Sequence, residues 1–130
     1  MIVLDASTVV ELLLNTAAGA RVASRIEDPQ LSLHAPHLLD LEVAQAMRRY
    51  ASAGILETDR AAQALTRLRE LDLERWSHEP FLPRIWELRD NLTAYDGAYV
   101  ALAEALDAPL VTLDRRIVAA PGIRALVETP

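Results

Sequence analysis

The 130-residue chain contains no cysteine. Disulfides and thiolate metal sites are therefore excluded, and any bound metal needs other ligands. No apolar run reaches the roughly 18 residues that a membrane-spanning helix needs. Residues 1–4 also lack the basic flank and the long apolar core of a signal peptide. We expect one domain, residues 1–130, in a soluble, cytoplasmic protein with no membrane partner.

Lysine is missing as well, because all 13 basic residues are arginine, and the net charge is −6. An acidic chain of this kind is not expected to bind nucleic acid through a broad basic surface. Mechanisms that need a lysine are unavailable to it. Arginine binds phosphate in bidentate fashion, so a local phosphate-binding rim is still compatible with the composition.

Common catalytic motifs are absent too. The chain has no G-x-x-x-x-G-K-[ST] phosphate loop, no G-x-G-x-x-G fingerprint and no G-x-S-x-G nucleophile elbow. The three histidines, His34, His37 and His78, show no zinc-ligand spacing, and we interpret them as strand-end or surface residues. Ser7 has no histidine or lysine base close to it in the sequence, which argues against a serine nucleophile.

The hydrophobic pattern alternates between strands and helices. Short apolar runs predict strands at residues 1–5, 31–35, 75–78 and 110–113, with a last edge strand at 123–127. Helical periodicity predicts the intervening helices, among them residues 16–27, 37–54, 58–74 and 94–106. Strands that alternate with helices predict an α/β fold, a single domain with a mainly parallel central sheet flanked by helices.

The periodicity also predicts which side chains of two helices face the core. In the helix over residues 37–54, the predicted apolar face is Leu38, Leu41, Ala44, Ala46 and Met47. In the helix over residues 58–74, it is Ala62, Leu65, Leu68 and Leu71. The polar residues of both helices, including Asp40, Arg60 and Arg67, are predicted to be solvated.

The stretch from residue 93 to residue 116 organises the chain. Thr93 is a good N-cap for a helix whose exit Asp107 marks. The apolar, β-branched run that follows is typical of a strand covered on both faces. Asp96 then lies in the first turn of the helix, and Asp114 lies at the carboxyl end of the strand.

Two further acids lie in comparable places. Asp5 ends the first predicted strand, where Ser7 or Thr8 is expected to cap the next helix, and Glu42 lies near an apolar helix face. Taken alone, Asp5 fits equally a cap or turn residue, and Glu42 fits a partly exposed residue at the edge of that face. In a parallel α/β sheet, however, ligands bind outside the carboxyl ends of the strands.

Asp5, Glu42, Asp96 and Asp114 are therefore expected to converge in one site. Four carboxylates without a basic partner repel one another strongly, and hard cations relieve that repulsion. Ligand sets made only of oxygen suit Mg²⁺ or Mn²⁺. Two such ions can activate a water molecule and stabilise the leaving oxygen of a phosphodiester.

Four motifs extend this pattern over almost the whole chain: M-I-V-L-D-A-S, L-E-V-A-Q-A-M-R-R, L-T-A-Y-D-G-A-Y-V-A-L-A-E-A-L and L-V-T-L-D-R-R. In these motifs and their order, the sequence resembles the PIN-domain family, specifically the VapC-type ribonuclease toxins of type II toxin–antitoxin systems. The resemblance implies a metal-dependent endoribonuclease that cleaves structured RNA and leaves a 3′-hydroxyl and a 5′-phosphate. It also implies inhibition by a cognate antitoxin protein and assembly as a homodimer.

The resemblance assigns roles to particular residues. The acidic metal-site residues would be Asp5, Glu42, Asp96 and Asp114. Ser7 and Thr112 would be hydroxyl helpers near the metal, and Arg115 or Arg116 would hold phosphates or pair with surface acids. The alanine that usually follows the central Tyr-Asp is Gly97 here, which is expected to loosen the first helical turn.

Two other classes compete with this interpretation. A receiver-like or haloacid-dehalogenase-like phosphoryl site also places aspartates at strand ends, but it uses a lysine that this chain lacks. A non-catalytic PIN-like module that binds RNA or protein is the closer alternative, and the presence of all four acids argues against it. Trp86 and Leu88 are expected in a dimer or antitoxin groove, because the chain has more apolar residues than a small core needs.

Overall fold

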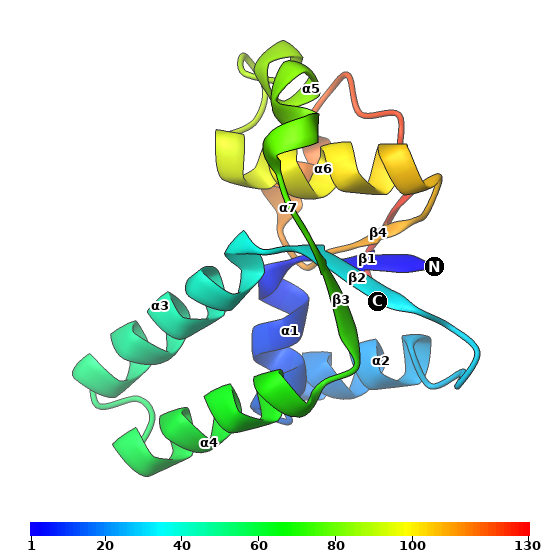
Figure 1. The fold of residues 1–130 in the computed structure, drawn as a ribbon. Helices are drawn as coiled ribbons and strands as arrows, with labels where there is room; N and C mark the ends of the chain where they lie inside the picture. The colour runs from blue at the N-terminus through cyan, green and yellow to red at the C-terminus, as the bar shows by residue number, and fades with distance from the viewer.

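The computed structural model describes residues 1–130, and its core is a single sheet with helices on both faces (Figure 1). The strands are β1 (Ile2–Leu4), β2 (Leu33–Pro36), β3 (Leu73–Trp76), β4 (Leu110–Val111) and β5 (Val127–Glu128). The helices are α1 (Ala6–Leu13), α2 (Ala17–Arg25), α3 (Leu38–Ser52), α4 (Thr58–Glu70), the 3-10 turn η1 (Glu79–Phe81), α5 (Leu82–Glu87), α6 (Ala94–Leu106) and α7 (Arg115–Ala119).

The sheet confirms the predicted α/β fold. Its five strands follow the order β3-β2-β1-β4-β5, and every pair is parallel. β1 lies at the centre and is fully buried, as a strand covered on both faces must be. The predicted strands lie at the expected places with shifted ends: β3 begins at Leu73, and the edge strand is Val127–Glu128.

The helices form two layers around this sheet. In Figure 1, α6 crosses one face of the sheet with α5 beside it, α1 and α2 lie on the other face, and α3 and α4 project away as a pair. A hydrophobic core of 26 buried residues joins the strands to the helices, and a smaller cluster of Ile85, Ala98 and Ala101 joins α5 to α6. None of the helices combines the length and the apolar character needed to cross a bilayer.

Side chains cap several of the helices. Thr93 caps α6 through its side-chain oxygen, as predicted, and Thr16 caps α2 in the same way. Asp107 ends α6 in the left-handed conformation with φ 49°. For α1, the prediction of Ser7 or Thr8 as the cap is wrong, because the Asp5 carboxylate accepts the hydrogen bond from the backbone N–H of Thr8.

The predicted core face of α3 is only partly correct, with Ala46 and Met47 buried as predicted. Leu41 is 75% exposed, whereas Leu39 and Val43 are fully buried. Both sides of this helix carry aliphatic residues, so the sequence pattern alone does not select the buried one. α1 and α4 select it, because α3 packs against both and Leu39 and Val43 join the hydrophobic core.

The same correction applies to α4. Leu68 is buried as predicted, and Leu65 and Leu71 are partly buried, but Ala62 is exposed and Ala61 and Ala64 are buried instead. Two of its arginines are also not simply solvated. Arg67 donates to the carbonyl oxygen of Leu13 at 2.7 Å, and Arg60 donates to that of Leu14 at 3.3 Å. They therefore satisfy carbonyl groups at the end of α1, which that helix itself leaves unpaired.

Two polar residues that we expected to be solvated or superficial form hydrogen bonds with side chains of β3. Asp40 accepts two hydrogen bonds from Arg75, at 2.7 and 3.0 Å, and so links α3 to β3. His34 is only 3% exposed, and its Nδ1 accepts a hydrogen bond from the indole nitrogen of Trp76 at 3.0 Å. Burial lowers the pKa of His34, in agreement with a neutral ring that accepts this bond.

Alanine substitution at the two helical glycines, Gly19 and Gly97, should have opposite effects on stability. A Cβ atom on Gly97 would lie 3.5 Å from the Ile85 methyl group, an ordinary contact, whereas one on Gly19 would overlap the Glu11 carbonyl oxygen where α2 crosses α1. Gly97→Ala should therefore raise the free energy of unfolding by about 0.5–1 kcal/mol. Gly19→Ala should lower it by about 1–3 kcal/mol. Urea unfolding measures both, and a destabilising Gly97→Ala would contradict an unstrained contact with Ile85.

Candidate active site

A cavity of about 560 Å³ opens at the carboxyl ends of β1 and β4. The pairing of these two parallel strands brings Asp5 and Asp114 to the same edge of the sheet. Glu42 reaches the cavity from α3, and Asp96 reaches it from the first turn of α6. The structure therefore brings together all four carboxylates that the sequence singled out.

Asp5 is the most constrained of the four, with 4% exposure. Its Oδ1 accepts hydrogen bonds from the Ser7 hydroxyl at 2.6 Å and from the Thr8 N–H at 3.1 Å, and its Oδ2 accepts one from the Thr112 hydroxyl at 2.5 Å. Asp5 is thus a helix cap, as one interpretation had it, and also part of the carboxylate cavity. These bonds hold the carboxylate in one orientation.

Ser7 and Thr112 also fix the loop that carries Asp114. The N–H of Leu113 donates to the Ser7 hydroxyl at 3.0 Å, and the N–H of Asp114 donates to the Thr112 hydroxyl at 2.9 Å. Each hydroxyl thus links the Asp5 carboxylate to the backbone after β4. The two residues that the resemblance named as helpers therefore set the relative positions of two carboxylates.

The cavity disfavours negative charge. Burial raises the pKa of Glu42 from 4.5 to about 7, and the charges of Asp96 and Asp5 push it in the same direction. Burial also raises the pKa of Asp5 and that of Asp96, with a further contribution from Asp114 in each case. Three of the four carboxylates therefore hold protons more tightly than free carboxyl groups do when no cation is present.

Tyr99 is a site residue that the sequence pattern did not single out. Its ring is 1% exposed, and its hydroxyl donates to Glu42 Oε1 at 3.3 Å. Burial and the charge of Glu42 raise the Tyr99 pKa, so the hydroxyl keeps its proton and remains a donor. Its position three residues after Asp96 is the signal that could have placed it beside the site, because such residues share a helix face.

Two arginines, Arg49 and Arg116, also line the cavity. Arg116 lines it and binds Asp114, with Nη2 2.7 Å from Oδ2 and Nε 3.1 Å from Oδ1. That pairing lowers the pKa of Asp114. Arg49, two helical turns after Glu42, lines the cavity as well, whereas Arg115 does not. The helix α7 begins at residue 115, and this turn directs the second arginine of the pair towards the acids.

The donor set fits a hard divalent cation. All four candidate ligands are carboxylates, no histidine lines the cavity, and the acids raise one another's pKa, which a bound cation would reverse. No three such side chains are gathered closely enough to enclose one ion. Metal binding would therefore need the carboxylate side chains to move closer together.

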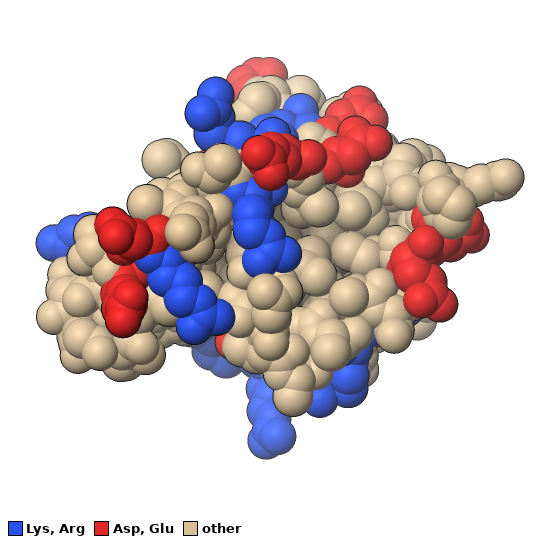
Figure 2. Space-filling view, turned by 90° about the horizontal axis from the view of Figure 1, so that it is seen from below, with Lys and Arg blue, Asp and Glu red and all other residues tan.

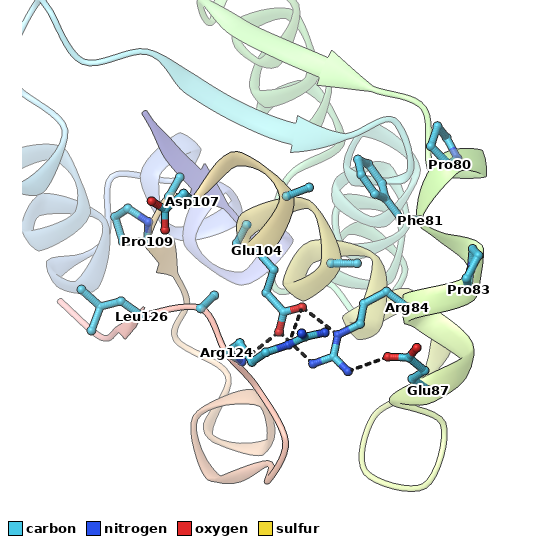
Figure 3. Close-up of a pocket in the computed structure, with 15 residues that line it drawn as sticks. Pro80, Phe81, Pro83, Arg84, Glu87, Glu104, Asp107, Pro109, Arg124 and Leu126 are labelled. Carbon is cyan, nitrogen blue, oxygen red and sulfur yellow. Dashed lines mark hydrogen bonds and ion pairs between the residues drawn. The ribbon is translucent and has the colours of Figure 1, made fainter.

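A second, larger cavity of about 750 Å³ lies at the opposite end of β4 (Figure 3). In it Glu104 of α6 binds Arg84 of α5 at 2.7 and 3.0 Å, and accepts the N–H of Arg124 at 2.8 Å. Arg84 also donates to Glu87 and to the carbonyl oxygen of Gly122. These charged groups neutralise one another and tie three segments together, so we assign this cavity a structural role.

The sequence comparison agrees with the geometry. The family model described as the PIN domain matches residues 2–123. The chain belongs to the PIN-domain family. Curated relatives of this PIN domain include Ribonuclease VapC12 of Mycobacterium tuberculosis, 41% identical over 98% of both chains. Ribonuclease VapC1 of the same species is 43% identical over 93% of this chain and 91% of its own.

Solved structures confirm the PIN-domain fold. The crystal structure of PAE2754 from Pyrobaculum aerophilum has a TM-score of 0.69 at 24% identity, over 97% of this chain and 89% of the other. VapBC2 from Rickettsia felis, bound to a DNA fragment from its promoter, has a TM-score of 0.71 at 14% identity, over 99% and 98% of the two chains. At these identities, the likeness concerns the fold alone.

The raised pKa of Glu42 predicts how stability depends on pH in the absence of metal. Between pH 4.5 and about 7, the folded protein retains a proton on Glu42 that the unfolded chain has lost. The free energy of unfolding should therefore fall as the pH rises through this range, and Glu42→Gln should flatten the slope. Urea unfolding in EDTA at several pH values measures it. Equal slopes for the two proteins would contradict the burial of this carboxylate.

Proposed function

We propose that this PIN domain is a metal-dependent endoribonuclease toxin that cleaves structured RNA and is neutralised by a cognate antitoxin. The convergence of four carboxylates on one cavity carries the proposal. It is supported by relatives above 40% identity that are named ribonucleases. Mg²⁺ or Mn²⁺ would be held by Asp5, Glu42, Asp96 and Asp114, since all of these donors are hard oxygen atoms.

Each residue around the cavity has a task in this reaction. Bound divalent cations supply an activated water and stabilisation for the leaving oxygen of the phosphodiester. Ser7 and Thr112 hold the Asp5 carboxylate in place, because both hydroxyls donate to it. Tyr99 orients Glu42 in the same way. The carboxylates bind the ions, and the hydroxyls preorganise the carboxylates, which removes part of the ordering cost of the site.

RNA binding would depend on the rim of this cavity. On the face shown in Figure 2, arginines and acids are interspersed around a broad uncharged area, so that face carries no continuous basic track. Arg49 and Arg116 line the cavity itself and suit backbone phosphates. Recognition by a few local contacts and by RNA shape is consistent with the net charge of −6.

The antitoxin and a second copy of the chain are the protein partners that we propose. The structurally similar VapBC2 is a two-component assembly on its promoter DNA. This chain also has an apolar surface that the fold leaves uncovered: Leu41, Leu82, Trp86 and Tyr95 are 52–75% exposed. Leu88, which we expected there with Trp86, is instead a core residue with 2% exposure.

These four exposed residues lie on the helices that build one small cluster. Leu38 and Phe81 pack against the buried cluster of Ile85, Ala98 and Ala101. Leu41 follows Leu38 by one turn, Tyr95 precedes Ala98 by one turn, and Trp86 is adjacent to Ile85. The surface they form spans α3, α5 and α6, and we propose it as the homodimer interface. An interface of this kind has a central aromatic residue as its anchor.

A shared metal centre predicts the effect of replacing each of the four acids. Asp5→Asn, Glu42→Gln, Asp96→Asn and Asp114→Asn should each lower RNA cleavage by at least about a hundredfold, because each removes charge from one metal centre. Combining two of them should add little, since residues that act as a unit have non-additive effects. EDTA should abolish cleavage by the wild-type protein, and Mg²⁺ or Mn²⁺ should restore it. Cleavage is measured with a labelled structured RNA under single-turnover conditions.

The matched control for these variants is Asp72→Asn. Asp72 is exposed just before β3 and does not line the cavity, so its loss should leave cleavage nearly unchanged. Asp40→Asn is a poorer control because it breaks the ion pair with Arg75. Cleavage that survives in EDTA, or double variants whose defects multiply, would disprove the shared metal centre. A protein that binds RNA without cleaving it under any metal condition would instead be the non-catalytic module.

The proposed homodimer interface predicts the effect of placing a charge on the apolar surface. Trp86→Glu should shift a dimer towards the monomer in sedimentation velocity, because a charge would be buried at the centre of the interface. Ile55→Glu is the matched control, since Ile55 is 72% exposed but lies beyond the end of α3, away from the cluster. A wild-type monomer at all concentrations, or an equal effect of both variants, would rule out this surface as the dimer interface.

A further inference from the structure

Arg116 is the only basic residue in a salt bridge with any of the four carboxylates. Asp5, Glu42 and Asp96 take part in none of the salt bridges of the structure. Asp114 accepts three hydrogen bonds from Arg116: from Nη2 at 2.7 Å, from Nε at 3.1 Å and from the backbone N–H at 2.9 Å. Its Oδ1 accepts two of them and its Oδ2 the third, so few lone pairs remain for a metal ion.

The side chain of Arg116 can also move away from Asp114. It is 76% exposed, whereas Asp114 is 19% exposed. Ion pairs of this kind contribute little net stability, because solvent screens them and both side chains must be held in one geometry. The backbone N–H bond that caps α7 does not involve the guanidinium. The guanidinium can therefore move without loss of the cap.

Two facts indicate where it would go. Arg116 lines the same cavity as the acids, so that it stays at the site after leaving Asp114. A guanidinium binds phosphate oxygens with the same bidentate geometry that it uses here on a carboxylate. An RNA backbone entering the cavity would bring such oxygens close to it.

We infer that Arg116 is a displaceable counter-ion: it neutralises Asp114 while the metal is absent, and it binds an RNA phosphate once a divalent cation has taken its place on Asp114. This inference rests on the proposed nuclease function, and it assigns to one side chain a part in both metal loading and substrate binding. Arg115 carries the same charge one residue away but lies outside the cavity. It therefore serves as the matched control.

Two opposite effects of Arg116→Gln test the inference. Without RNA, its Mg²⁺ affinity measured by calorimetry should rise about two- to fivefold, the range that an exposed ion pair allows. With saturating Mg²⁺, its KM for RNA should rise about tenfold while kcat changes little, as expected for the loss of one charged hydrogen bond. Arg115→Gln should change each value less than half as much. Arg116→Lys, which keeps the charge but not the bidentate geometry, should fall between wild type and Arg116→Gln.

A spectroscopic signal reports the displacement directly. The ¹⁵N resonance of Arg116 Nε, assigned by its absence in Arg116→Gln, should shift on titration with Mg²⁺ in the absence of RNA. The inference would be overturned if Arg116→Gln bound Mg²⁺ more weakly than the wild type or if Arg115→Gln had equal effects. It would also be overturned if the Nε resonance did not shift with Mg²⁺. In those cases, loss of cleavage in Asp5→Asn would still support the nuclease function. Wild-type protein that binds Mg²⁺ but leaves RNA intact would overturn that function instead.

Discussion

The hydrogen bonds on the Asp5 carboxylate are the constraint on which the rest of the site depends. Asp5 ends the central strand β1, caps α1 and binds the hydroxyls of Ser7 and Thr112. Those hydroxyls in turn hold the backbone that carries Asp114. One carboxylate thus sets the direction of the first helix, the loop after β4 and the spacing between two acids. The parallel pairing of β1 with β4 makes this possible, because it ends both strands at the same edge.

The second constraint is electrostatic. The fold places Glu42 and Asp96 beside the β1 and β4 acids, where burial and mutual repulsion raise the pKa of three of the four carboxylates. A divalent cation would relieve this unfavourable charge, and its binding would then be coupled to folding. Only Asp114 has a cationic partner within the chain, Arg116, and its pKa is lowered accordingly.

The helices α3 and α4, compared with α6, show which structural features a sequence pattern cannot predict. For α6 the expected cap, the expected exit and the position of Asp96 are all correct, because these features depend on local chemistry. For α3 and α4 the type and approximate extent are correct, but the buried faces are only partly so: Met47 and Leu68 are buried as predicted, whereas Leu41 is exposed. Both helices carry aliphatic residues on more than one side, and the neighbours that choose among them, such as the core around Val43, come from distant parts of the chain. A local period cannot report that choice.

The sequence by itself determined the order and type of most helices and strands, the oxygen-only chemistry of the site, and the four acids that meet there. These follow from composition, from strand and helix periodicity, and from the parallel topology that alternation imposes. Only the tertiary structure decided that Asp5 rather than Ser7 caps α1, that Tyr99 binds Glu42, and that Arg116 rather than Arg115 faces the acids. Each of these is a contact geometry, fixed by the angles at which packed elements meet, and sequence spacing does not contain those angles.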